Sequence, residues 1–253
     1  MDPDGAHLVV GATGRLGPLL LRRLVRLGAR HLVVVGRRGV PDTVADAVRG
    51  EGAELTAVRA DVADEDAMST LFARFGGDLP ALRGIYHMAF AEDVTPLAEL
   101  DARRLADVLR PKVTGTAVLH RLSADLPVEE FLCYSSTTAL LGSHSMAAYA
   151  AAGAFQDALL HLRRRTGREA HVVNWGTWAT GLDGTPEAGL ITATGMRLMA
   201  GERAVAALDH VIGARDTQWV VADADWPRMA AAYATRTPTP LLAHEAAPAH
   251  PAP

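Results

Sequence analysis

Short apolar runs alternate with amphipathic segments along most of this chain, and this alternation constrains the fold more strongly than any other feature. Seven short runs predict strands: 7–10, 31–35, 54–58, 84–88, 131–135, 170–175 and 218–222. The run at 31–35 is apolar and β-branched, which is typical of a strand buried on both faces. Between them, apolar residues recur at helical spacing over 18–27, 42–50, 64–75, 96–108, 111–124 and 146–166. Strands that alternate with helices form right-handed βαβ units, so we predict an α/β fold with a doubly wound parallel sheet of about seven strands and helices on both faces.

The length of 253 residues suits one such domain, which we expect to cover 1–235. The stretch 176–200 is rich in Gly and Thr, which favours a lid near 180–200 with one short helix. The stretch 236–253 is rich in Pro and Ala and predicts a flexible tail.

Composition excludes several classes of protein. The formal net charge of −4 argues against a nucleic-acid binder. The single cysteine, Cys133, excludes an internal disulfide and a paired-cysteine metal site, and the sequence has neither the HExxH motif of zinc proteases nor the GxSxG motif of hydrolases. The start has no signal peptide and no apolar run reaches about 18 residues, so we expect a cytoplasmic protein with no metal and no membrane contact.

A glycine-rich turn lies between the first predicted strand and the first predicted helix. In "GATGRLG", Gly11, Gly14 and Gly17 permit a tight turn and let backbone amides approach a pyrophosphate at the N-terminus of the helix. Because the motif stands between an apolar strand and an amphipathic helix, it predicts dinucleotide binding in a Rossmann-type fold.

The end of the second predicted strand indicates which dinucleotide binds. An enzyme that uses NAD would place an acidic residue there, whereas this chain has Arg37 and Arg38. A guanidinium suits a 2′-phosphate, so NADPH is favoured over NADH. Asp61 and Val62 follow the third strand and would border the adenine.

Three residues form a candidate catalytic group. Lys112 is the only lysine in the chain, Ser136 follows the fifth strand, and Tyr149 lies near the start of the helix at 146–166. In a carbonyl reduction, Tyr149 would give a proton to the oxygen, and a nearby Lys112 ammonium would lower the tyrosine pKa by favouring the phenolate. Ser136 would hydrogen-bond the substrate oxygen and stabilise charge that develops there.

Over roughly residues 7–235 the sequence resembles the short-chain dehydrogenases/reductases, and within them the catalytic part of polyketide synthase ketoreductase domains. The motifs that carry the resemblance include "GATGRLG", "VVVGRRG", "ADVADEDAM", "LRPKVTG", "YSSTTALLGSHSMAAYAAAGAFQDAL" and "VVNWGTWATG". It implies reduction of a 3-oxoacyl thioester on the phosphopantetheine arm of an acyl carrier protein, in polyketide or hybrid peptide–polyketide biosynthesis. It implies Lys112, Ser136 and Tyr149 as catalytic and places the substrate beside Leu141, His144 and Met146. The cofactor-binding residues it implies are Gly11, Thr13, Gly14, Arg15, Leu16, Gly17, Arg37, Arg38, Asp61, Val62, His87, Lys112, Tyr149 and Trp175.

The sequence departs from these relatives at places that bear on activity. The helix motif usually reads Tyr-x-x-x-Asn, and Gly153 takes the Asn position, so a redox-inactive epimerase or a non-catalytic dinucleotide-binding homologue is the alternative function. Glu92-Asp93-Val94 stands where relatives of one product stereochemistry have Leu-Asp-Asp, and Leu141 stands where those of the other have Trp. Neither stereochemical marker applies.

Modular relatives carry a structural subdomain before the catalytic part, and only six residues precede the first predicted strand here. We expect a free-standing reductase that meets its carrier protein in trans rather than an excised domain. Acyl chain length and oligomeric state, including a homo-oligomer, are left open by the sequence.

Overall fold

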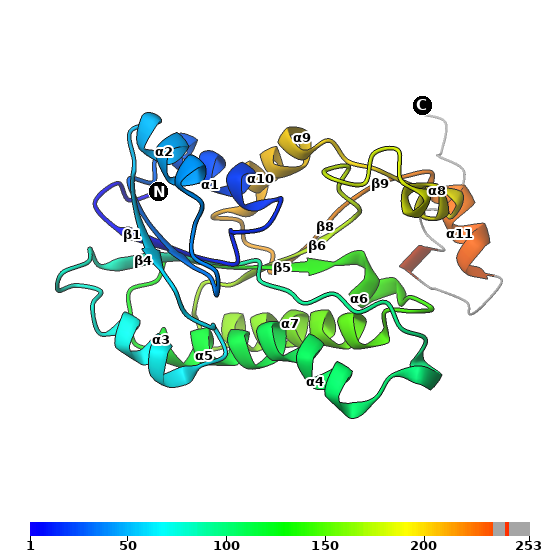
Figure 1. The fold of residues 1–253 in the computed structure, drawn as a ribbon, viewed down its shortest axis with the longest axis horizontal. Coiled ribbons are helices and arrows are strands. Elements are labelled where there is room, and N and C mark those ends of the chain that lie inside the picture. Colours follow the sequence, from blue (N-terminus) through cyan, green and yellow to red (C-terminus); the bar gives the residue numbers. More distant parts are fainter. Residues whose placement is uncertain (235–240, 243–253) are drawn as a thin grey trace.

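Seven parallel strands form one sheet in the computed structural model, which describes residues 1–234 and 241–242 (Figure 1). The strands are β1 (Ala6–Val10), β2 (His31–Val35), β3 (Glu54–Val58), β4 (Leu82–His87), β5 (Glu130–Ser136), β6 (His171–Trp175) and β8 (Gln218–Val221). Their order is β3-β2-β1-β4-β5-β6-β8, so the direction of winding reverses between β1 and β4. This confirms the predicted Rossmann-type sheet, in which ligands bind beyond the carboxyl ends of the strands at the point of reversal.

Helices cover both faces of the sheet (Figure 1). One face carries α1 (Gly17–Arg26), α2 (Asp42–Gly50), α9 (Gly201–Ala206) and α10 (Leu208–Val211). The other carries α3 (Glu65–Phe72), α4 (Ala102–Leu109), α5 (Gly115–Leu122) and α7 (Ala147–Arg165). Near the carboxyl ends of β5 and β6 lie α6 (Thr137–Leu141), α8 (Pro186–Ala193) and α11 (Trp226–Ala234), with a small antiparallel sheet of β7 (Met196–Arg197) and β9 (Asp223–Ala224).

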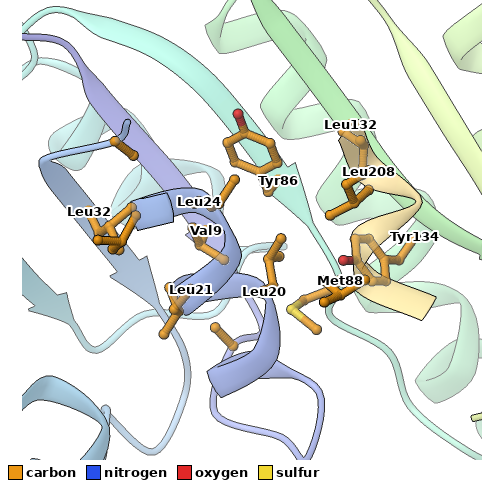
Figure 2. Close-up of a cluster of buried hydrophobic side chains, with 14 of the residues drawn as sticks. Val9, Leu20, Leu21, Leu24, Leu32, Tyr86, Met88, Leu132, Tyr134 and Leu208 are labelled. Atoms are coloured by element: carbon orange, nitrogen blue, oxygen red, sulfur yellow. The ribbon is translucent and has the colours of Figure 1, made fainter. Parts of the chain in front are cut away.

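The two-residue period of β1 divides its side chains between two cores. Val9 packs against Leu20 and Leu24 of α1, in the cluster that Figure 2 shows. Leu8 and Val10 belong to the opposite cluster, which includes residues of α3, α5 and α7. All five residues of β1 are buried, as expected for a central parallel strand with both faces covered.

The structure corrects the two helices predicted at 96–108 and 111–124. Residues 97–99 form a single 3₁₀ turn, and α4 begins at Ala102, where the Asp101 carboxylate caps the N–H of Arg104. From there one helical run continues to Leu122, interrupted by a π-helical turn at Arg110–Thr114. Pro111 lacks an N–H and its ring cannot fit the preceding turn of an α-helix, which accounts for the wider turn here.

The lid predicted near 180–200 contains the short helix α8, as expected. The flexible tail predicted at 236–253 lies largely outside the described residues. Of the two residues that are described there, Leu242 is buried against Met229 of α11 and Met196 of β7. No helix within 1–234 or 241–242 is long and apolar enough to cross a membrane.

Candidate active site

Lys112 lies on the π-helical turn between α4 and α5, a distortion that often marks a functional position in a helix. Two neighbouring side chains hold this turn. The Thr116 hydroxyl donates to the Lys112 carbonyl, and His87 Nε2 lies 3.0 Å from the Pro111 carbonyl oxygen. The turn therefore directs the Lys112 side chain inward, where only 2% of the residue remains exposed.

The Lys112 ammonium is enclosed by hydrogen-bond acceptors. Its Nζ donates to the Tyr134 carbonyl of β5 and, at 2.9 Å, to Gln156 Oε1 of α7. Burial lowers the pKa of Lys112 to about 8, while the nearby Asp157 carboxylate acts in the opposite direction. Lys112 is therefore mostly charged at neutral pH and loses its charge in mildly alkaline solution.

Tyr149 lies on the first turn of α7, with the Lys112 Nζ 5.4 Å from the centre of its ring. Burial and, to a smaller extent, the Glu92 carboxylate raise the pKa of Tyr149 to about 12, against the lowering effect of a hydrogen bond with the Ser136 side chain. The net pKa is raised because burial of the phenol dominates, so the expected lowering by Lys112 stays a prediction. In this structure the ammonium donates to the Tyr134 carbonyl and to Gln156.

Ser136 ends β5, and its hydroxyl caps α6 by accepting the N–H of Thr138 at 3.1 Å. The buried Asn174 on β6 fixes this strand end, because its Nδ2 donates to the Ser136 carbonyl at 3.2 Å and to Ser135 Oγ at 3.1 Å. Asp157 of α7 accepts from the same amide at 2.9 Å. Neighbouring elements thus hold Ser136 beside Tyr149.

The glycine turn after β1 fits a dinucleotide pyrophosphate. A side chain at Gly17 would clash with the Ala12 backbone and one at Gly11 with the backbone of Ala89, so these two glycines close the turn. At Gly14 a Cβ would meet only the Gly11 carbonyl, 4.0 Å away, which leaves the exposed backbone open to a ligand. The first turn of α1 has no acidic residue, so its partial positive charge is uncompensated.

The other residues predicted on this turn lie at its edges. Thr13 packs on Gly36 at the end of β2, and Leu16 precedes α1. The Arg15 guanidinium donates to the Gly181 carbonyl at 2.9 Å, which connects the turn to the start of the predicted lid.

The residues predicted to select the cofactor and to border its adenine lie after β2 and β3. Arg37 and Arg38 are exposed, and Arg59 Nε donates to the Arg37 carbonyl at 3.1 Å. Asp61 is already paired, since Arg110 Nε donates to its carboxylate at 3.1 Å, and Val62 is buried against Gly115.

His87 and Trp175, which the resemblance implies at the cofactor, are both buried. His87 is completely buried, and burial lowers its pKa to about 3, so it is a neutral residue that supports the π turn. Trp175 is 3% exposed and packs between Tyr134 and Trp178 in the core. Its Nε1 is buried without a partner among the described residues.

The residues predicted to contact substrate lie at the end of α6 and on its connection to α7. Met146 directly precedes α7 and bridges to Thr95, whose N–H donates to the Ser145 carbonyl at 2.8 Å. His144 is exposed, whereas Leu141 packs against the apolar cluster under α8 and α11.

Phe90, which follows β4, is not predicted as a site residue by the sequence. The residue is 54% exposed, and its ring meets the Tyr149 ring edge-on at 6.2 Å between centres. No pattern in the sequence distinguishes this aromatic residue. Among the described residues, no cluster of His, Cys, Asp or Glu is arranged to hold a metal ion.

Fold and site together define a short-chain dehydrogenase/reductase: a doubly wound sheet, a glycine turn after β1, and a Ser–Tyr–Lys group beyond β5. Comparison with known proteins narrows the class. Residues 5–180 match the KR domain family, and the chain belongs to that family of polyketide synthase ketoreductases.

Sequence relatives are polyketide synthases. The chain is 43% identical over 239 residues to a subunit of the phenolphthiocerol/phthiocerol polyketide synthase of Mycobacterium bovis, covering 93% of this chain and 16% of the relative. It is 37% identical over 252 residues to erythronolide synthase EryA3 of Saccharopolyspora erythraea, covering 98% of this chain and 8% of that protein. The chain thus spans less than a fifth of these relatives, so free-standing action stays a prediction.

Solved structures with the same fold are also polyketide synthase ketoreductases. An A-type ketoreductase from a modular polyketide synthase matches with a TM-score of 0.89 and 35% identity, covering 97% of this chain and 54% of that one. The first ketoreductase of the tylosin polyketide synthase matches with a TM-score of 0.87 and 33% identity, covering 98% and 56%.

Proposed function

We propose that this protein reduces a 3-oxoacyl thioester, carried by an acyl carrier protein in polyketide or hybrid peptide–polyketide biosynthesis, to the hydroxyacyl thioester with NADPH. The observation that carries the proposal is the buried Lys112 ammonium 5.4 Å from the Tyr149 ring, with Ser136 hydrogen-bonded to that tyrosine. Membership of the KR domain family supports the reaction type.

NADPH would supply a hydride to the carbonyl carbon. Tyr149 gives its phenolic proton to the carbonyl oxygen, and its pKa of about 12 keeps it protonated for this task at neutral pH. As the proton leaves, the Lys112 ammonium stabilises the phenolate charge through the low-dielectric interior. Ser136 donates to the same substrate oxygen and balances the charge that develops on it.

The residues that would hold NADPH are those of the glycine turn and the two arginines after β2. Backbone amides around Gly14 and the N-terminus of α1 suit the pyrophosphate. Arg37 and Arg38 suit a 2′-phosphate because both are exposed at the end of β2.

The test is NADPH absorbance with a simple 3-oxoacyl thioester, for the wild type and Tyr149→Phe, with NADPH binding followed by fluorescence. We expect the wild type to consume NADPH and the variant to bind it without turnover. Equal turnover by both proteins would overturn the role of Tyr149.

Gly153 in place of the motif asparagine favours a second candidate, a redox-inactive epimerase. A 2-methyl-3-oxoacyl thioester in D2O separates the two. Exchange of the α-hydrogen by the wild type, without loss of NADPH absorbance, would support the epimerase.

A further inference from the structure

We propose that Gln156 is a positioning residue that keeps the Lys112 ammonium charged and directed at Tyr149. The catalytic consequence rests on the proposed function, whereas the effect of Gln156 on the charge of Lys112 does not.

A closed ring of buried hydrogen bonds carries this inference. Lys112 Nζ donates to Gln156 Oε1 at 2.9 Å, Gln156 Nε2 donates to Thr116 Oγ1 at 3.0 Å, and Thr116 Oγ1 donates to the Lys112 carbonyl. Gln156 and Thr116 are completely buried. The amide is thus fixed at both ends, so the oxygen, and not the nitrogen, faces the ammonium.

Few other groups stabilise the charge on Lys112. The ionisable groups that face it are His87 from β4, Cys133 from β5, and Tyr149 and Asp157 from α7. Burial lowers the pKa of His87 to about 3 and raises those of Cys133 and Tyr149 to about 12, so these three are neutral at pH 7. Besides Asp157, the charge therefore depends on its acceptors, the Tyr134 carbonyl and Gln156.

Gln156 lies on the face of α7 that packs against the π turn. Tyr149, Gly153 and Gln156 follow one another at helical spacing, so they share the face that packs against the π turn. Gly153 offers no side chain at the motif position. Gln156, about one turn after Gly153, therefore supplies the only side-chain amide on this face of α7, and this amide reaches Lys112.

The single lysine makes a direct test possible. In protein labelled with ¹³C-lysine, the Cε signal reports the protonation of Lys112 alone, without substrate or cofactor. Gln156→Leu removes one acceptor, and we expect the Lys112 pKa to fall by about one pH unit or more. Gln156→Glu keeps an acceptor and adds negative charge, and we expect the pKa to rise.

Leu160→Ala is the matched control. Leu160 is completely buried one turn further along α7, so its truncation loosens the helix without touching the ring of hydrogen bonds. We expect this variant to lose stability but to keep the wild-type Lys112 pKa. A Lys112 pKa in Gln156→Leu that equals the wild-type value would overturn the proposal.

Kinetics supply the second readout. The alkaline limb of NADPH turnover is expected to move to lower pH in Gln156→Leu together with the Lys112 pKa, and to stay in place in Leu160→Ala. A uniform loss of turnover with an unmoved limb would reduce Gln156 to a structural role and overturn the inference. If the wild type consumes no NADPH, the proposed function fails, while the lysine titration still decides whether Gln156 sets the charge.

Discussion

Gly153 on α7 and Ala139 on α6 pack so closely that a Cβ added at Gly153 would lie 2.8 Å from the Cβ of Ala139. Ser135 Oγ would lie 3.0 Å away on another side. The missing side chain at Gly153 is therefore matched to its surroundings. An asparagine at this position, as in the usual motif, would require α6 to move away or residue 139 to be smaller than Ala139.

This contact reverses the usual effect of replacing a helical glycine. In a helix interior, Gly→Ala normally stabilises by roughly 0.5–1 kcal/mol, but overpacking costs about 1–3 kcal/mol. We expect Gly153→Ala to lower the free energy of unfolding by about 1 kcal/mol, as measured by urea denaturation, and Ala139→Gly/Gly153→Ala to recover most of that loss.

Gly189 on α8 provides the control, because nothing lies within 4 Å of a Cβ added there. Gly189→Ala is expected to stabilise by up to about 1 kcal/mol. If Gly153→Ala stabilised the protein equally, the close approach of α6 and α7 would have no energetic consequence.

Arg37 is predicted to select NADPH over NADH. Removing a charged partner of the 2′-phosphate in Arg37→Ala should raise the Michaelis constant for NADPH about tenfold and leave that for NADH nearly unchanged. Arg49→Ala is the matched control, since Arg49 is an exposed arginine of α2 paired with Asp46. An equal rise for both cofactors would contradict the role of Arg37.

The residue pattern predicts the sheet well because central parallel strands are apolar runs, as in β1 and β2, although the edge strands β3 and β8 are partly exposed. The glycine turn can also be recognised in the sequence, because only glycine fits at Gly11 and Gly17. The Ser–Tyr–Lys group is recognisable because a lone lysine and a strand-end serine stand at fixed places in this topology.

What the sequence does not reveal depends on hydrogen-bond register and burial. The π turn around Lys112 changes the pairing inside a continuous helix, and Pro111 is its only marker. Gln156 is one polar residue on an amphipathic helix until its contact with Lys112 is seen. The raised Tyr149 pKa likewise follows from desolvation, which no spacing of residues encodes.

Glu92 is expected to reduce the fraction of Tyr149 present as phenolate, which is the base in the reverse, alcohol-oxidising direction. Its carboxylate raises the pKa of Tyr149, so Glu92→Gln should lower that pKa and increase oxidation with NADP⁺ at mildly alkaline pH. Because Glu92 is exposed, added salt should shrink the difference between the two proteins. Glu99→Gln, a change on the same connection between β4 and α4, is the control, and an equal response in both variants would contradict a specific effect of Glu92.

The buried pair of His171 on β6 and Glu130 on β5 should make stability depend on pH. Burial by itself lowers the pKa of His171, but the hydrogen bond and charge of Glu130, at 2.6 Å, outweigh it, and the net pKa is raised above 6.5. A raised histidine pKa stabilises the fold fully below the unfolded value, and this contribution is lost as pH rises through the folded value. We therefore expect the His171–Glu130 contribution to weaken as pH rises above about 6.5.

Glu130→Gln isolates this contribution. Its destabilisation, measured by urea denaturation, should be largest in acid, up to about 3 kcal/mol, and should shrink as pH rises. Glu54→Gln removes the partner of the less buried His31 on β2 and should show little dependence on pH, because an exposed pair contributes little. A Glu130→Gln cost that stayed constant from acid to alkaline pH would mean that His171 is neutral in the folded protein and that the pair acts only as a hydrogen bond.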